Sequence, residues 1–132
     1  MVDFKSLIPL PITWESWELE KLDIAVIGRS TLQSFETAFV MFNNKLWLEC
    51  QCQCKILIDF LWEKLNTGHW KDINIVWRYA YSYASVVKGI CEYHLSDTHS
   101  VKFNKPEAMR TIDMGLLMGA PILGNVLSVI AS

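Results

Sequence analysis

Cysteine side chains give this sequence its first candidate for metal chemistry. Three cysteines alternate with glutamine over residues 50–54, and two residues separate Cys91 from His94. Structural zinc is held tetrahedrally by Cys and His ligands, which commonly come in such closely spaced pairs. On a helix, however, Cys50 and Cys54 share one face, whereas Cys52 lies about 200° around the axis. All three reach one ion only if the helix unwinds, so we interpret Cys50, Cys54 and Cys91 as small core residues rather than zinc ligands.

Histidine could instead serve a non-haem iron centre, which needs two histidines and a carboxylate, commonly introduced by a His-x-Asp/Glu motif. The residues two positions after His69, His94 and His99 are Lys71, Ser96 and Val101. None of them is a carboxylate, so the sequence predicts no iron site. We interpret the three histidines as polar residues of solvated loops or helix ends.

Motifs for nucleophilic catalysis and phosphate binding are missing from the sequence. It has no Gly-x-Ser-x-Gly, no Walker loop and no dinucleotide fingerprint. Gly115, Gly119 and Gly124 lie in an apolar stretch, which favours close helix packing. Asp113 faces apolar neighbours in the same stretch, and a buried carboxylate can be catalytic when its pKa is shifted. No His or Lys partner is evident nearby, so we interpret Asp113 as a residue that makes a structural hydrogen bond or lies on the helix surface.

Composition restricts the class of protein. The chain has 132 residues, the usual size of one domain. Hydrophobic residues make up 52% of it and charged residues 20%, which excludes a disordered protein and predicts apolar surface that a partner covers. The net charge is −2 and Lys and Arg do not cluster, so we expect no direct binding of nucleic acid or of an anionic membrane.

Residues 114–131 form an uncharged stretch that could be mistaken for a membrane span. It is 18 residues long and interrupted by glycine and proline, whereas a span needs about 20 apolar residues. No cluster of Lys or Arg flanks it, so we interpret it as a buried helix or helix pair. The N-terminus has no signal core, and the crowded cysteines fit no disulfide framework, which indicates a reducing compartment, the cytosol or nucleus.

Hydrophobic periodicity predicts helices over residues 30–42, 45–65 and 72–94, and a fourth from a capping box at 104–107. Asp72 is the expected N-cap of the third helix. Apolar residues surround most of that helix, so we expect it at the centre of the fold. Pro121 should kink or end the fourth helix near Met118, and a fifth is expected over 122–130. The third helix keeps only a narrow polar strip: Arg78, Ser82, Ser85, Gly89 and Glu92.

These elements predict an all-α fold of about five helices, arranged as two antiparallel helical hairpins plus a C-terminal helix. The shape is loosely tetratricopeptide-like, although the repeat signature is not reproduced. We expect residues 1–132 to form a single helical domain with its helical core at 29–132. Pro9 and Pro11 interrupt the first 28 residues, which we expect to be either irregular or a short helix.

Tryptophans bracket the turn between the second and third helices. Trp62 precedes the turn, Trp70 lies in it and Trp77 follows it. Tryptophan fills cores and also anchors interfaces. We interpret Trp77 as a core residue, whereas Trp70 suits either role.

Two long motifs carry a family resemblance. Residues 62–72 read Trp-Glu-Lys-Leu-Asn-Thr-Gly-His-Trp-Lys-Asp, and residues 113–124 read Asp-Met-Gly-Leu-Leu-Met-Gly-Ala-Pro-Ile-Leu-Gly. Both are similar to the N-terminal region of the JmjC-domain-containing protein five family, also called lysine-specific demethylase eight. Trp70, Asp72, Trp77, Arg78 and a following tyrosine, Tyr79 or Tyr81, match the family's order and spacing. The resemblance covers about residues 59–129, while residues 1–58 resemble the family only in helical pattern and Cys50.

The resemblance implies that a C-terminal JmjC barrel, absent from this chain, carries the chemistry. That barrel is an iron(II) and 2-oxoglutarate-dependent oxygenase, with arginyl hydroxylation and histone demethylation among its assigned activities. The iron ligands of the family lie in the barrel. The resemblance therefore implies no catalytic, metal or cofactor-binding residue in this chain. It also implies a nuclear protein with links to chromatin, transcription and the cell cycle. In one alternative the protein is present in the cytoplasm as well.

We therefore predict a non-catalytic protein-interaction module that docks partner or substrate proteins. His69, Trp70 and Arg78 are its candidate partner-binding residues. By resemblance, the partners are a propeller of the chromosome-condensation-regulator type, the transcription-elongation kinase or the protein's own JmjC domain. Alternatives are a structural domain that packs on its JmjC barrel, a homodimer formed through Gly115 and Gly119, and, least favoured, a small metal-binding domain.

Overall fold

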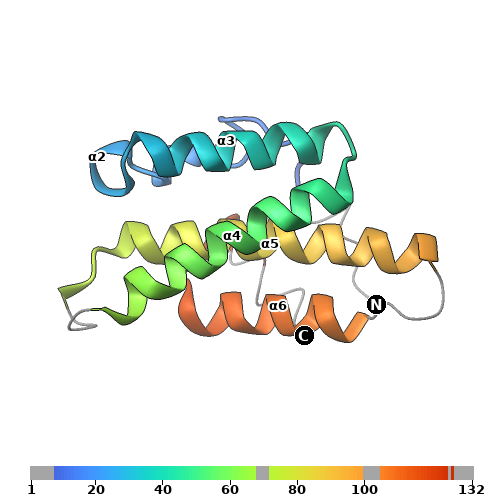
Figure 1. Ribbon diagram of the computed structural model, residues 1–132. Coiled ribbons are helices and arrows are strands. Elements are labelled where there is room, and N and C mark those ends of the chain that lie inside the picture. Colours follow the sequence, from blue (N-terminus) through green and yellow to red (C-terminus); the bar gives the residue numbers. More distant parts are fainter. Residues whose placement is uncertain (1–7, 68–71, 100–104, 125, 127–132) are drawn as a thin grey trace.

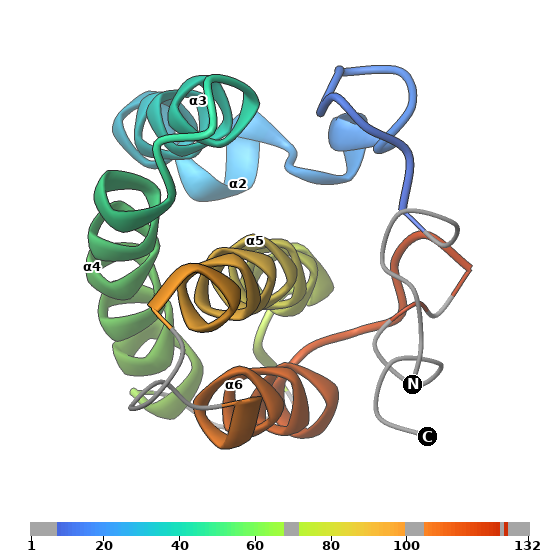
Figure 2. The same ribbon diagram turned by 90° about the vertical axis from the view of Figure 1, so that its right-hand side faces the viewer.

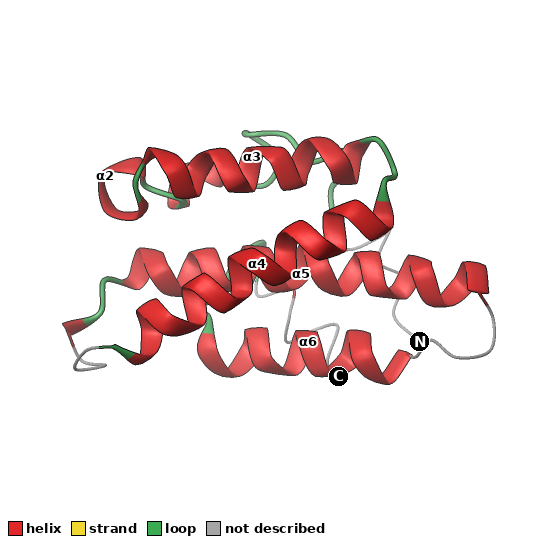
Figure 3. Ribbon diagram, viewed as in Figure 1, coloured by secondary structure: helices red, strands yellow, loops and turns green. Residues whose placement is uncertain are grey.

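A computed structural model describes residues 8–67, 72–99, 105–124 and 126. The described residues form helices and loops without strands (Figure 3), which confirms the all-α prediction. A short 3-10 helix and a single-turn helix precede four longer helices. In chain order these elements are η1 (Leu19–Lys21), α2 (Ile24–Ile27), α3 (Arg29–Asn43), α4 (Trp47–Asn66), α5 (Ile75–His99) and α6 (Lys105–Met118).

The long helices form two consecutive antiparallel hairpins, α3 with α4 and α5 with α6 (Figure 1). Viewed along its axis, α5 lies in the middle, with α4 beside it, α6 on another side and α3 beyond (Figure 2). All residues from Ala80 to Val87 are buried. The prediction of a central third helix, packed by neighbours on several sides, is therefore confirmed.

The polar strip of α5 is not a solvent-facing edge. Ser82, Ser85 and Glu92 on this strip are all buried. Glu92 accepts hydrogen bonds from Lys88 on its own helix and from Thr111 on α6. The strip is thus a buried polar seam, in which hydrogen bonds within the protein replace those with water at Glu92.

The α5 N-terminus differs from the sequence prediction. The backbone N–H of Val76 donates to the side chain of Asn74 at 3.0 Å, so Asn74 rather than Asp72 caps the helix. Asx side chains of both types cap equally well, and the pattern alone could not separate two candidates two residues apart. The other long helices begin and end within two residues of the predicted bounds.

Helix α6 ends at Met118, before Pro121. The Ser82 hydroxyl on α5 donates to the carbonyl of Ala120 at 2.7 Å and accepts from its N–H at 2.9 Å, which ties the outgoing chain to the central helix. Leu123 has a positive φ, so the chain turns instead of continuing as a helix. The expected fifth helix therefore does not start at Ile122, and residues 127–130 lie outside the described part.

The first 28 residues are mostly irregular where described, and they pack on the core. Trp17 is fully buried, and its indole N–H donates to the carbonyl of Pro9 at 2.6 Å. The Tyr83 hydroxyl on α5 donates to the carbonyls of Trp17 and Glu18 at 2.6 and 2.9 Å. Helix α2 was missed by the sequence analysis, since its four residues are too few to show a period. Gly28 follows it with φ 87°, which suits glycine.

Candidate interaction surface

Three of the four cysteines are core residues, as predicted. Cys50, Cys54 and Cys91 are fully buried, and the Cys50 thiol donates to the carbonyl of Ala38 at 3.2 Å. Hydrogen bonding to Cys50 and then burial raise the pKa of both Cys54 and Cys91, so these two stay protonated thiols. Only Cys52 is exposed. A buried thiol out of reach of solvent has no access to a substrate, so this cluster stabilises α3, α4 and α5 against one another.

His94 is not a solvated helix-end residue. It lies within α5, half-buried, and its imidazole stacks on the Trp47 indole with ring centroids 4.1 Å apart and planes at 6°. The side chains of His69 and His99 lie outside the described residues. Within the described part of the chain, no three His, Cys, Asp or Glu residues are grouped so as to hold a metal ion. The described residues therefore do not fit an iron centre.

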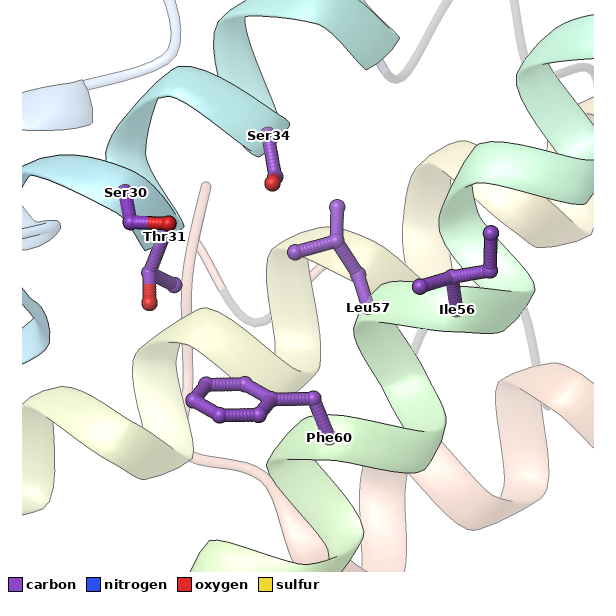
Figure 4. Close-up of a pocket in the computed structure, with 6 residues that line it drawn as sticks. All are labelled: Ser30, Thr31, Ser34, Ile56, Leu57 and Phe60. Carbon is purple, nitrogen blue, oxygen red and sulfur yellow. The ribbon is translucent and has the colours of Figure 1, made fainter.

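A groove with one apolar wall lies between α3 and α4. It encloses about 190 Å³ (Figure 4). Hydroxyl groups of the first turns of α3 form one wall, and apolar side chains in the middle of α4 form the other. The lining residues are Ser30, Thr31, Ser34, Ile56, Leu57 and Phe60.

The apolar wall of the groove is exposed to solvent. Ile56 is 67% exposed and Phe60 is 39% exposed. Their spacing of four residues places them on one face of α4, beside the buried stripe that includes Leu57 and Leu61. Ile56 and Phe60 were not predicted as site residues, because the whole region fits the helical pattern. Their apolar character outside the buried stripe was the signal that could have found them.

An aromatic pair continues the groove toward the end of α4. The Phe60 ring meets the Trp77 ring edge to face, with centroids 6.2 Å apart. The Lys64 ammonium lies 5.5 Å from both ring centres, a cation–π arrangement. Trp77 is half-buried, which agrees with its predicted place against the core. One end of the groove is therefore aromatic and positively charged.

The structure places only one of the three predicted partner-binding residues. Arg78 follows Trp77 in the first turn of α5 and is half-buried. His69 and Trp70 lie outside the described residues, so their role stays a prediction. Trp62 lies on α4, before the turn between α4 and α5, and is exposed. Trp62 on α4 and Trp77 on α5 thus place aromatic side chains on either side of the turn between these helices.

Of the three glycines predicted to favour close helix packing, Gly119 does so, whereas Gly124 has a positive φ and nothing within 4 Å of an added Cβ, so the prediction is wrong for Gly124. Gly115 is buried. A Cβ atom added to Gly119 would collide with the Ser82 hydroxyl on α5 and would lie 2.5 Å from the Gly115 carbonyl oxygen. Gly119 thus allows the end of α6 to pack closely on α5. No helix in the described part of the chain is long and apolar enough to cross a membrane.

Consecutive antiparallel helices stacked around a shared core define an all-helical domain of the repeat type. A family model described as KDM8-like, N-terminal ARM repeats, matches residues 38–131. The chain belongs to this family. The ARM repeat description replaces the loose tetratricopeptide analogy, with the same principle of stacked helices.

Curated relatives extend the likeness over nearly the whole chain. Lysine-specific demethylase 8 of Danio rerio is 32% identical over 131 residues, covering 95% of this chain and 29% of the relative. Lysine-specific demethylase 8 of Xenopus tropicalis is 39% identical over 125 residues, covering 93% and 26%. Lysine-specific demethylase JMJ30 of Arabidopsis thaliana is 37% identical over 65 residues, covering 49% and 14%. No solved structure matches the chain significantly.

These comparisons identify the chain as the N-terminal region of the family. The match reaches beyond residues 59–129, where the motifs made the resemblance evident, into the first half of the chain. The chain spans 29% and 26% of the length of the first two relatives.

Proposed function

We propose that this chain is a non-catalytic docking domain of a JmjC-type demethylase and that the groove between α3 and α4 receives a protein partner. The exposed apolar wall formed by Ile56 and Phe60 carries the proposal. Contiguous apolar surface of this kind is costly in water and typically marks an interaction site. The chemistry would then belong to the rest of the longer protein, where the family's iron(II) and 2-oxoglutarate are bound.

The partner proposed first is another protein of the nucleus. Family resemblance suggests a propeller of the chromosome-condensation-regulator type or the transcription-elongation kinase. The shape of the groove supports a short apolar segment, because one wall offers apolar contacts and the other offers the hydroxyls of Ser30, Thr31 and Ser34. The role would be to position the oxygenase near its substrate in chromatin or transcription complexes.

A second candidate is a structural role, in which the groove packs on the protein's own JmjC barrel. The same apolar wall favours this hypothesis, since an intramolecular domain interface would cover it equally well. The two hypotheses differ in what occupies the groove, so a binding measurement separates them.

Isothermal titration calorimetry on this chain tests both hypotheses. The titrants are a propeller protein, the kinase and the separately expressed JmjC region. Docking to a partner predicts saturable binding to the propeller or the kinase, and the structural role predicts binding to the JmjC region. If none of the three binds, the docking proposal is wrong.

Matched variants place the binding face. Ile56→Lys introduces a charge into the groove and should weaken binding at least about tenfold, which is about 1.4 kcal/mol. Leu48→Lys makes the same change on α4 at a site outside the groove that is 57% exposed, and it should leave affinity unchanged. Equal losses in both variants, or no loss in Ile56→Lys, would contradict the assignment to the groove.

A further inference from the structure

A second cavity lies between α4, α5 and α6, and it shares no lining residue with the groove. Its volume is about 180 Å³. Unlike the groove, it is lined by two basic side chains and several hydroxyl groups as well as by apolar side chains. The lining residues are Ile58, Tyr81, Ser85, Lys88, Arg110, Thr111 and Met114.

Ser85 gives the first indication that this cavity takes a ligand. The residue is 1% exposed, and its hydroxyl has no hydrogen-bond partner among the described residues. A serine inside a helix commonly bonds the carbonyl one turn earlier, and this one does not. Buried hydroxyls are nearly always paired, because an unpaired one costs about 1–3 kcal/mol. Ser85 therefore lines the cavity with a hydroxyl whose donor and acceptor are unused among the described residues.

Lys88 and Arg110 supply the charge. The Lys88 ammonium lies 3.1 Å from a Glu92 carboxylate oxygen and 3.2 Å from the Thr111 hydroxyl, and its side chain is 17% exposed. An ammonium has three protons to donate, and these two contacts use two of them within the described part of the chain. Glu92 balances one of the two positive charges. Arg110 adds a second positive charge to the lining, and Lys88 keeps at least one proton unused among the described residues.

Tyr81 adds a further donor. Burial, followed by the nearby Asp59 carboxylate, raises the pKa of its phenol, so the hydroxyl keeps its proton at neutral pH. The remaining lining is apolar, with Ile58 on α4 and Met114 on α6. A ligand that satisfies the whole cavity therefore needs one acceptor end with a single negative charge and a short hydrocarbon part.

We propose that this cavity binds a short aliphatic carboxylate, whose oxygens accept hydrogen bonds from Ser85, Lys88 and Arg110 while its methylenes contact Ile58 and Met114. Hydrogen bonds to a charged acceptor are about twice as strong as neutral ones, which explains the preference for an anion. A phosphate fits less well, because it has no hydrocarbon part and would leave Ile58 and Met114 without contacts. The site does not depend on the docking proposal.

NMR titration of this chain with butyrate tests the assignment. Two comparison ligands are used. Butyramide is the neutral isostere of butyrate, and inorganic phosphate is an anion without a hydrocarbon part. Saturable shifts of the backbone amides around Ser85, Lys88 and Thr111 are expected with butyrate, with affinity at least about tenfold above that of butyramide.

Two variants probe the contacts without disturbing the paired groups. Ser85→Ala removes a hydroxyl that makes no bond among the described residues, and Arg110→Gln changes an exposed residue, so both should keep the parent fold. Each should weaken butyrate binding about tenfold. Lys55→Gln, which removes an exposed cation of α4 outside the cavity, should bind as the parent does.

Several results would overturn the proposal. They are the absence of saturable butyrate shifts, equal binding of butyramide, tighter binding of phosphate, and parental affinity in both Ser85→Ala and Arg110→Gln. The last result would mean that the Ser85 hydroxyl is satisfied by water alone.

Discussion

The side-chain amide of Asn43 pairs with both backbone groups of Ile12. Its oxygen accepts from the Ile12 N–H at 2.8 Å, and its NH₂ group donates to the Ile12 carbonyl at 2.9 Å. Asn43 ends α3, and Ile12 is buried in the N-terminal segment. One side chain thus makes the pair of hydrogen bonds that a neighbouring β-strand would make, and it holds an irregular segment on the helical core.

Asn43→Ala should detach this segment. Two part-buried backbone groups of Ile12 would lose their partners, so we expect the free energy of unfolding to fall by about 1–3 kcal/mol. Hydrogen exchange of the Ile12 amide should accelerate while exchange in the middle of α5 changes little. Urea unfolding and exchange mass spectrometry measure the two effects. Asn44→Ala, at the adjacent exposed position, is the control and should change neither.

The packing of this segment shows where sequence reasoning reached its limit. Periodicity located α3, α4 and α5 because each carries a long buried stripe. Residues 8–28 have no period, and their order depends on contacts distant in sequence, such as Asn43 with Ile12 and Tyr83 with Trp17. A single sequence does not reveal such pairs. The two alternatives, irregular or a short helix, therefore stayed open until the structure showed irregular chain with two very short helices.

Tyr83 is predicted to make stability fall at alkaline pH. Burial first, and then the carboxylates of Glu18 and Glu20, raise the pKa of its phenol above the ordinary value of about 10. The folded state therefore holds this proton at pH values where the unfolded state has lost it. Stability from this group is complete below pH 10 and declines as the pH rises from 10 toward the folded-state pKa.

Tyr83→Phe separates this effect from general alkaline denaturation. The variant loses the bonds to the carbonyls of Trp17 and Glu18, so it should be about 1–2 kcal/mol less stable at neutral pH. Its free energy of unfolding should also decline less steeply above pH 10 than that of the parent. Tyr81, whose pKa is shifted in the same direction, leaves a residual slope. Parallel pH profiles of parent and variant, measured by urea unfolding, would contradict the prediction.

Thiol reactivity should distinguish Cys52 from the other three cysteines. Cys52 is exposed, whereas Cys50, Cys54 and Cys91 are fully buried. A thiol reagent that releases a coloured product should therefore titrate one thiol rapidly in the native protein and the rest only on unfolding. Cys52→Ser should abolish the rapid phase and leave the melting temperature unchanged. Rapid reaction of a second thiol would show that the α3–α4–α5 core opens more readily than its packing indicates.

As with the fold, some features of the candidate sites could be predicted from the sequence and others could not. Burial of Cys50, Cys54 and Cys91 could be predicted because they fall on the apolar stripes of their helices. The groove beside Ile56 could not, because its other wall comes from α3 and its shape depends on how the two helices cross. The cavity beside Ser85 was even harder to predict from the sequence. It depends on α6 leaving one hydroxyl of a polar seam unpaired while pairing its neighbours.

Gly119→Ala should be among the most destabilising single-methyl additions in the chain. The new Cβ would collide with the Ser82 hydroxyl and crowd the Gly115 carbonyl, and backbone cannot yield as a flexible side chain does. We expect a loss of about 2–3 kcal/mol, the upper range for overpacking. Gly124→Ala is the control for adding a methyl group at a glycine. Nothing lies within 4 Å there, so only the positive φ opposes the change, and the loss should be about 1–2 kcal/mol.

A double-mutant cycle identifies which contact causes the destabilisation by Gly119→Ala. Ser82→Ala alone removes the two hydrogen bonds to Ala120 and should itself destabilise the protein. Because it also removes the atom that the new methyl group meets, Gly119→Ala should cost less in the Ser82→Ala background than in the parent. Thermal unfolding of the four proteins gives the coupling energy. Strict additivity would show that the Gly115 carbonyl, rather than the Ser82 hydroxyl, sets the limit on how closely the end of α6 approaches α5.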